Sequence, residues 1–323
     1  MIDILSLQPT VISKDLKGKY TLIYGKPKVG KTTLASKFPN NLLIAFEKGY
    51  NAVGGIIAQD ITKWAEFKQV IRQLDKKEAK EKFDTITIDT ITEAWIMCEK
   101  YVCVQNNVQK ISEIPWGQGY AACKEEFAKS LRDITMMGYG LVLIAHSGRR
   151  IEIDEKGSEI EFISPEMPKR CYEIVNQLVD IIAYISSEPD GRFLYTRATN
   201  NIMAGSRFPY LKEKIPLGYE NFANAIAEAI ELQEKRDGVK VVEFEERKHE
   251  EKLDFDTIRN EAQALWKKLV SDNPDPALQE DNARRIMDRI NAIFGHEMRL
   301  SEITENQVDL FNLVLMEMKD LDR

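Results

Sequence analysis

Residues 25–33 have the residue types and spacing of a phosphate-binding loop. The run Gly25-Lys26-Pro27-Lys28-Val29-Gly30-Lys31-Thr32 matches the pattern GxxxxGK(S/T), and Thr33 follows it. In such a loop, backbone N–H groups surround the β-phosphate of a nucleotide, and the N-terminus of the next helix adds positive charge. Lys31 would reach the β- and γ-phosphates, and the Thr32 hydroxyl would be a ligand of Mg²⁺. The segment therefore predicts a site for a nucleoside triphosphate and magnesium.

An acidic side chain that could hold the magnesium shell closes a second apolar segment. Residues 83–89 form a run rich in β-branched residues that ends at Asp89, 58 positions after Lys31. This is how a Walker B strand supplies its carboxylate. The structural alternative is a buried strand whose Asp89 caps the following segment. With a phosphate-binding loop upstream, we predict that Asp89 and Thr32 form the metal site.

Two further polar side chains end apolar segments. Glu47 closes the run 41–47, and a carboxylate at that edge of a parallel sheet can orient or deprotonate the attacking water. His146 follows the apolar run 141–145, where a side chain can sense whether a γ-phosphate is present. The structural alternatives are an ordinary exposed glutamate and a histidine satisfied within the fold.

The elements that must position these residues alternate between strands and helices. Strands are predicted at 20–24, 42–46, 85–89, 141–145, 180–185 and 192–196, and helices at 32–37, 64–74, 120–137 and 168–178. Alternating polar and apolar residues at 150–154 and 159–163, around the turn residues 155–158, predict an inserted β-hairpin. The first part of the chain is therefore predicted to be an α/β core with a mostly parallel sheet.

The residue pattern of the chain changes after Gly218, from alternating strands and helices to helices and a charged segment. A helix is predicted at 221–232, followed by a segment so densely charged that it can bury little. Apolar residues then recur at helical spacing in three stretches, separated by Asn273-Pro274-Asp275-Pro276 and by Gly295. We predict an ATPase core at 1–232, a charged linker or solvated helix at 233–254, and a small helical bundle at 255–323.

Composition narrows the class of protein. The 323 residues contain 45 Lys and Arg against 52 Asp and Glu, a formal net charge of −7, so whole-molecule attraction to nucleic acid is not expected. The four cysteines form no CxxC pair and the three histidines are scattered, which indicates neither a zinc site nor a disulfide framework. No stretch approaches about 18 uninterrupted apolar residues. We therefore expect a cytoplasmic protein that does not associate with membranes.

The four polar elements, in this order, resemble the RecA-like ATPases, and specifically the phage-encoded, Sak-type AAA ATPases that act in single-strand annealing or recombination. The resemblance covers about 16–207. It rests on the phosphate-binding loop and on four further segments, Phe46-Glu47-Lys48-Gly49-Tyr50, Thr87-Ile88-Asp89-Thr90, Pro115-Trp116-Gly117-Gln118-Gly119-Tyr120 and Ile144-Ala145-His146-Ser147. It implies a RecA-like fold, binding and hydrolysis of ATP, Glu47 as the residue that activates water and His146 as the sensor. Two residues depart from the family pattern, because Lys28 stands where glycine is common and His146 where RecA has glutamine.

The resemblance also implies contacts with single-stranded DNA through two loops. The first, 105–118, contains Lys110 and Trp116, and the second, 147–166, contains Arg149 and Arg150. Aromatic rings that stack on bases and cations that follow the backbone suit sequence-tolerant binding. The structural alternatives are that Trp116 anchors a helix start in the core, and that the arginines pair with glutamates of the hairpin.

Enzymes of this class usually receive a cation from a neighbouring subunit at the γ-phosphate. Arg207 is the first candidate and Arg197 the second, and either role implies a ring or a filament. The leading hypothesis is an ATPase that assembles on single-stranded DNA in phage recombination. The alternative is a nucleotide-gated loader or adaptor whose C-terminal helices bind a protein partner. A small-molecule kinase is disfavoured by the extra strand and the hairpin.

Overall fold

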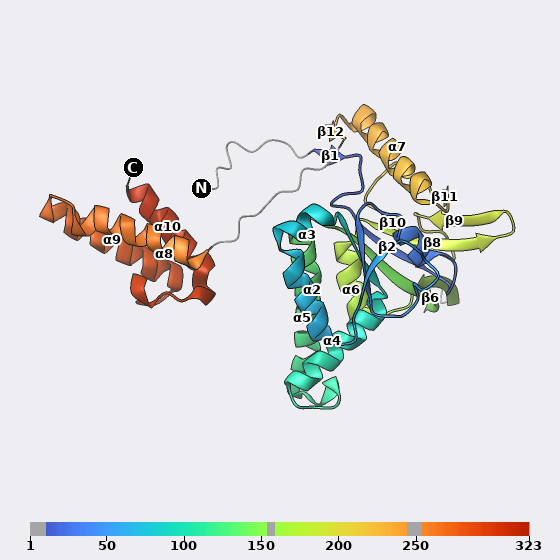
Figure 1. Cartoon of the computed structure of the whole chain (residues 1–323), viewed down its shortest axis with the longest axis horizontal. Coiled ribbons are helices and arrows are strands. Elements are labelled where there is room, and N and C mark those ends of the chain that lie inside the picture. Colours follow the sequence, from blue (N-terminus) through green and yellow to red (C-terminus); the bar gives the residue numbers. More distant parts are fainter. Residues whose placement is uncertain (1–10, 154–158, 244–253, 323) are drawn as a thin grey trace. The chain divides into compact units, whose positions relative to one another are not determined.

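The computed structural model describes residues 11–153, 159–243 and 254–322 (Figure 1). The chain divides into two compact units, a larger one within Pro9–His249 and a smaller one within Glu250–Arg323. The predicted turn 155–158 and residues 244–253 of the predicted linker lie outside the described residues.

A ten-stranded sheet forms the centre of the larger unit. Its main path runs β11 (Lys214–Pro216), β9 (Gly191–Tyr195), β8 (Ile181–Glu188), β2 (Tyr20–Gly25), β6 (Gly140–Ile153), β5 (Thr85–Asp89), β3 (Asn41–Ala45) and β4 (Ile57–Asp60). The strands from β8 to β4 are parallel, so their carboxyl ends meet at one edge. The strand β6, which carries His146, lies between β2, which precedes the phosphate-binding loop, and β5, which ends at Asp89.

Antiparallel strands extend this sheet on one side. β9 pairs with β8 and β11, and the short β10 (Gly205–Ser206) pairs with the beginning of β8. The predicted hairpin is present: β7 (Glu159–Pro165) pairs with the second half of β6, from Ser147 to Ile153. β6 is continuous from its parallel part into this hairpin, so the hairpin and His146 share one strand.

Helices cover both faces of the sheet (Figure 1). One face packs against α2 (Trp64–Leu74), α4 (Ile91–Gln105), α5 (Gln118–Met136) and α6 (Lys169–Leu178), with an aromatic cluster that includes Trp64 and Phe127. The other face packs against α1 (Lys31–Ala35) and α7 (Tyr219–Asp237). The short α3 (Lys77–Lys82) follows α2. The prediction of an α/β core with a mostly parallel sheet and an inserted hairpin is confirmed.

The structure differs from the sequence-based assignment at several elements. The helix α4 and the edge strand β4 were not predicted. The predicted helix at 221–232 is longer, because α7 continues to Asp237. The predicted linker also contains β12 (Val241–Val242), which pairs in parallel with β1 (Ile12–Ser13).

The smaller unit consists of three amphipathic helices around their own apolar core. α8 (Phe255–Trp266) continues into a π-helical turn, η4 (Lys267–Ser271), and is followed by α9 (Pro276–Phe294) and α10 (Val308–Leu321). α9 begins after the N-cap Asp275, whose carboxylate accepts from the N–H of Ala277, and ends at Gly295 in the left-handed conformation. The C-terminal helices are thus as the sequence predicts. Within the described residues, no helix is both long and apolar enough to cross a bilayer.

Candidate functional site

The phosphate-binding loop lies between β2 and α1, as its pattern requires. Lys31 is the first residue of α1, and Gly30 before it has φ 111°, a conformation that L side chains rarely adopt. A Cβ at Gly25 would lie 3.0 Å from the carbonyl oxygen of Ile185, so the loop leaves β2 close to the β8 backbone. Lys28 has φ 64°, which explains why glycine suits this position, and its side chain is exposed. The exposed Thr33 follows on α1.

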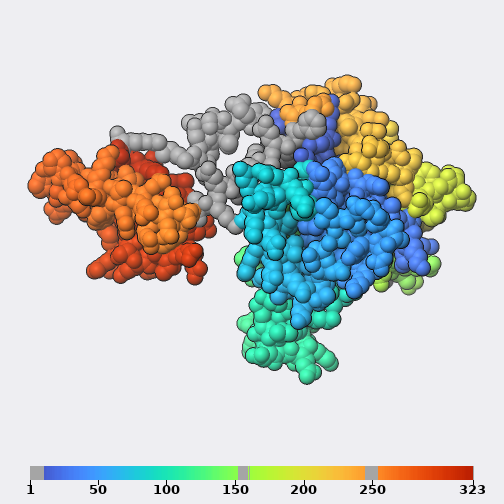
Figure 2. All heavy atoms as spheres, viewed as in Figure 1, coloured from blue at the N-terminus to red at the C-terminus, as the bar shows by residue number. Residues whose placement is uncertain are grey.

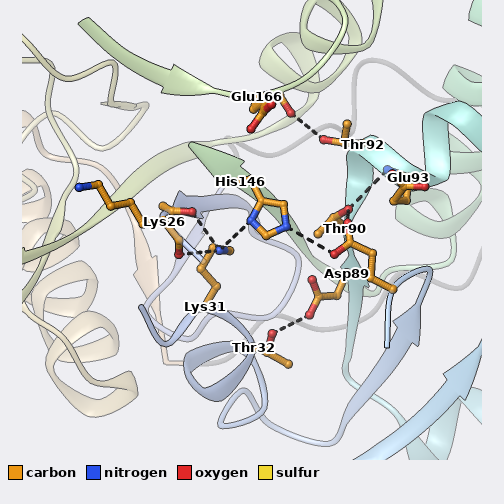
Figure 3. A network of polar contacts seen from close by, with 11 residues as sticks. Lys26, Lys31, Thr32, Asp89, Thr90, Thr92, Glu93, His146 and Glu166 are labelled. Atoms are coloured by element: carbon orange, nitrogen blue, oxygen red, sulfur yellow. Dashed lines mark hydrogen bonds and ion pairs between the residues drawn. The ribbon is translucent and has the colours of Figure 1, made fainter. Parts of the chain in front are cut away.

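The side chain of Lys31 is folded over this loop. Its Nζ donates to the carbonyl oxygens of Gly25 at 2.9 Å and Lys26 at 3.0 Å, and lies 3.4 Å from Nδ1 of His146. Burial lowers the pKa of the Lys31 ammonium, while the carboxylates of Asp89 and Glu47 partly oppose this shift. Figure 3 shows the Lys26 side chain pointing away from His146. Of the two lysines, only Lys31 reaches the polar cluster.

Thr32 and Asp89 meet although they are far apart in the sequence. The Thr32 hydroxyl donates to Oδ2 of Asp89 at 2.6 Å (Figure 3). Asp89 is buried at the end of β5, and burial raises its pKa, partly opposed by that hydrogen bond. A hydroxyl and a carboxylate oxygen beside the phosphate-binding loop are hard ligands of the kind that Mg²⁺ takes, one or two at a time. These two residues therefore fit a magnesium ion.

Glu47 and His146 reach the same cluster from β3 and β6. Oε1 of Glu47 accepts from the Thr90 hydroxyl at 2.5 Å, and Oε2 lies 3.4 Å from Nε2 of His146. The backbone N–H of Glu47 also donates to the carbonyl oxygen of Asp89 at 3.1 Å. Sequence reasoning assigned no role to Thr90, which holds Glu47 in place; its position directly after the Walker B aspartate was the available signal.

The neighbours of His146 favour one of its tautomers. The ammonium of Lys31 can only donate, and this favours Nδ1 as the acceptor and a proton on Nε2, toward Glu47. Lys31, His146, Glu47 and Thr90 thus form one chain of polar contacts along the carboxyl edge of the sheet. Parallel strands explain this convergence, because β2, β5 and β3 end at that edge and the parallel pairing of β6 with β2 ends there at His146.

We expect Asp89→Asn to make the ligand-free protein more stable at neutral pH. The raised pKa means that ionising Asp89 costs more in the folded than in the unfolded state, so the carboxylate subtracts stability above that pKa. The asparagine oxygen still accepts from Thr32. Thermal unfolding in EDTA should show a higher midpoint for the variant at pH 7.5, with the difference shrinking as the pH falls toward the ordinary range of aspartate. An unchanged or lower midpoint at pH 7.5 contradicts the prediction.

With magnesium and ATP, the same variant should lose activity by about 10–100-fold.

Arg192 is a site residue that sequence reasoning missed. It lies at the start of β9, and its Nη1 donates to the carbonyl oxygen of Val29 at 3.1 Å. The same nitrogen lies 3.0 Å from the position that a Cβ on Gly30 would occupy. The guanidinium therefore supports the loop from outside. No local motif marks it, since 163 residues separate the two partners.

We expect Arg192→Ala to weaken nucleotide binding by about tenfold. A charge-assisted hydrogen bond is worth roughly 1.5–3 kcal/mol, and the low end of this range applies because the side chain is exposed. The turnover number should change little, since the Lys31, Glu47 and His146 contacts remain. Titration with a fluorescent ATP analogue and steady-state kinetics separate these effects. Arg192→Lys, which keeps the charge, should fall between the native protein and the alanine variant. Native affinity in Arg192→Ala would mean that the contact is not needed.

The structure does not bring Arg207 into this cluster. Its Nη1 lies 2.9 Å from Oδ1 of Asp180, immediately before β8, and its Nη2 donates to the carbonyl oxygen of Gln177. This is the amino end of β8, whereas the phosphate-binding loop follows the carboxyl end of β2. Arg197 donates to the carbonyl oxygens of Leu211 and Pro209. A role for either arginine at a neighbouring subunit's nucleotide stays a prediction.

The four candidate DNA contacts are exposed side chains. Trp116 is 93% exposed, so it does not anchor a helix in the core; Ile111 and Ile114 are the buried residues there. Arg149 pairs with Glu161 at 3.1 Å, as the structural alternative expected. Lys110 and Trp116 belong to the segment between α4 and α5, and this segment extends from the body of the larger unit (Figure 2). Arg149 and Arg150 lie on the β6–β7 hairpin.

The hairpin is connected to the polar cluster through its base. The N–H of Glu166, directly after β7, donates to the carbonyl oxygen of His146 at 2.8 Å. The carbonyl oxygen of Glu166 accepts from the Thr92 hydroxyl at 2.7 Å, in the first turn of α4 (Figure 3). The hairpin, the sensor strand and the segment after Asp89 are therefore joined by hydrogen bonds.

Comparison with known proteins gives the following relatives. A family model described as an AAA domain matches residues 17–208. The SPbeta prophage-derived uncharacterized protein YorG of Bacillus subtilis (strain 168) is 31% identical over 336 residues, which cover 99% of this chain and 98% of that protein. The flagellar accessory protein FlaH of Methanocaldococcus jannaschii is a solved structure with 12% identity and a TM-score of 0.34, covering 62% of this chain and 85% of that one.

Proposed function

The chain belongs to the AAA domain family of P-loop proteins, and from this premise we propose that it is a magnesium-dependent ATPase of phage origin. The observation that carries the proposal is the cluster of Lys31, Thr32, Asp89, Glu47 and His146 around the phosphate-binding loop. The phage origin rests on the likeness to a prophage-derived protein over nearly the whole length of both chains.

In the proposed reaction, the residues of the cluster bind the phosphates of ATP, hold the metal ion or take a proton from the attacking water. The ammonium of Lys31 offsets charge on the β- and γ-phosphates, and the backbone N–H groups of the loop bind the β-phosphate. Thr32 and Asp89 would hold a magnesium ion, which offsets phosphate charge when bound. Glu47 takes a proton from the attacking water through the carboxylate that Thr90 positions. His146, with its proton on Nε2, reports on the γ-phosphate to the strand β6 that carries it.

We further propose that the protein binds single-stranded DNA as an oligomer and acts in annealing or recombination. Segment 105–118 contains only one cation and one anion, so its contribution would be base stacking on the exposed Trp116. The cations come from the hairpin, at Arg149 and Arg150. The hydrogen bond from Glu166 to the carbonyl oxygen of His146 supports a link between DNA at the hairpin and ATP turnover.

The test of the DNA proposal is ATP hydrolysis with and without a single-stranded oligonucleotide, at low and moderate salt. We expect stimulation by DNA, and binding that weakens as salt rises. Trp116→Ala should weaken DNA binding by about tenfold, since stacking on one aromatic ring is worth roughly 1–3 kcal/mol. Lys77→Ala, an exposed lysine of α3, is the matched control. Fluorescence anisotropy of a labelled oligonucleotide gives the affinities.

The same experiment separates the alternative function. Hydrolysis indifferent to DNA, with no salt-dependent binding, would contradict the recombination proposal. A nucleotide-gated loader or adaptor would behave in that way, because its target is another protein. The ATPase proposal itself would remain intact, since it depends on the cluster at the sheet edge alone.

A further inference from the structure

The smaller unit contains a groove with a volume of about 720 Å³, within the range of ordinary ligand sites. Residues of α8, α9, α10 and the segment that precedes α10 line it. Its apolar lining includes Phe255, Trp266, Met287 and Leu300. Its polar lining includes two arginines, Arg259 and Arg299. All lining residues belong to the smaller unit, so the groove shares no residue with the nucleotide site.

The charge of the groove is opposite to that of the unit around it. Residues 254–322 contain 8 Lys and Arg against 15 Asp and Glu. The residues that line the groove nevertheless include two arginines and no carboxylate. Arg259 lies 2.7 Å from the exposed Asp256 and 5.6 Å from the centre of the Phe255 ring. This arrangement favours a ligand that places a few carboxylates beside an apolar group.

Trp266 gives the groove a donor as well as an apolar surface. It is half-buried, and its indole N–H has no hydrogen-bond partner among the described residues of the chain. A tryptophan in such a position usually donates to a partner, so a ligand carbonyl or carboxylate can accept from it. The residue immediately precedes the π-helical turn η4, and π-helical turns occur frequently at functional sites.

We propose that this groove binds a short segment of a partner protein, with apolar side chains against the walls that Phe255 and Trp266 help to form and neighbouring carboxylates on Arg259 and Arg299. A nucleic acid is less suitable, because a net negative unit repels a long polyanion over several ångströms. A short acidic peptide brings only a few charges and buries an apolar group in return. The proposal does not depend on the ATPase function.

The test uses the full-length protein and a fluorescein-labelled peptide, Asp-Asp-Asp-Leu-Phe with a free C-terminal carboxylate. Fluorescence anisotropy should show saturable binding that the double variant Arg259→Ala/Arg299→Ala weakens by at least about tenfold. Arg284→Ala is the matched control, because this arginine of α9 pairs with Asp281 and does not line the groove. The intrinsic fluorescence of the native protein should change on binding, and this change should be lost in Trp266→Phe.

Three results would overturn the proposal. The first is no binding of the peptide by the native protein, or equal binding by the double variant after circular dichroism has shown both to be folded. The second is equal affinity for Lys-Lys-Lys-Leu-Phe, which would remove the argument from charge. The third is displacement of the peptide by an unlabelled oligothymidylate that itself binds more tightly and depends on both arginines, which would identify a nucleic-acid site.

Discussion

Lys31→Ala should abolish measurable ATP hydrolysis, with a loss of about 10²–10³-fold expected from removing one preorganised charge at the phosphates. The reason is geometric as well as electrostatic. The Nζ of Lys31 is buried and held by two carbonyl oxygens of the loop, 3.4 Å from His146. An alanine removes the cation, and no other lysine of the loop is directed into the cluster in its place. The measurement is phosphate release under saturating ATP and magnesium.

The control for this variant is Lys37→Ala. Lys37 is an exposed lysine two residues after the end of α1, outside the loop. Its removal changes the net charge by the same amount and should leave hydrolysis within about twofold of native, as expected for a surface position. Because burial lowers the pKa of Lys31, removing its charge should not in itself destabilise the fold, and circular dichroism shows whether the variant is folded. Activity within tenfold of native in folded Lys31→Ala would contradict the assignment.

The parts of the fold that could be predicted are those with a clear period or motif. α2 has the predicted bounds, Trp64–Leu74, because its apolar residues recur on one face. α4 escaped prediction because it is apolar on most sides, packing against β5, β6, α2 and α5 at once. The edge strand β4 escaped prediction because it is short. Its side chains alternate between exposed and half-buried, and the glycine-containing segment before it gives no sign of a strand.

The site was predictable to the extent that it follows strand ends. Lys31, Glu47, Asp89 and His146 meet because each follows, or lies at the end of, the parallel part of a strand at one edge of the sheet, which the alternating pattern of strands and helices already implies. Arg192 was not predictable, because it comes from the antiparallel side of the sheet through a contact that only tertiary structure creates. The exposure of Trp116 could not be predicted from the sequence either, because Ile111 and Ile114 nearby are the residues that pack into the core.

Glu47→Gln should lower the turnover number by about 10²–10⁴-fold while leaving ATP affinity within a few-fold of native. Glutamine has the same shape, and its amide oxygen can still accept from the Thr90 hydroxyl that Glu47 accepts from at 2.5 Å. What it cannot do is take a proton from water. The loss should therefore appear in single-turnover hydrolysis, with binding of a fluorescent ATP analogue almost unchanged.

This split between binding and turnover distinguishes a catalytic carboxylate from a structural one. If Glu47 only fixed His146 through their 3.4 Å contact, the glutamine variant would retain much of its turnover. Its single amide oxygen can accept from Nε2 when the amide group is turned so that its NH2 group donates to the hydroxyl oxygen of Thr90. Glu125→Gln, on an exposed position of α5, is the matched control for loss of one carboxylate. If Glu47→Gln keeps more than a tenth of native turnover, another group must act as the general base. Asp89 would be a poor substitute, since with Thr32 it is proposed to hold the magnesium ion. A variant that binds ATP without hydrolysing it would also hold the protein in its triphosphate state, which is the state to use when testing for assembly on DNA.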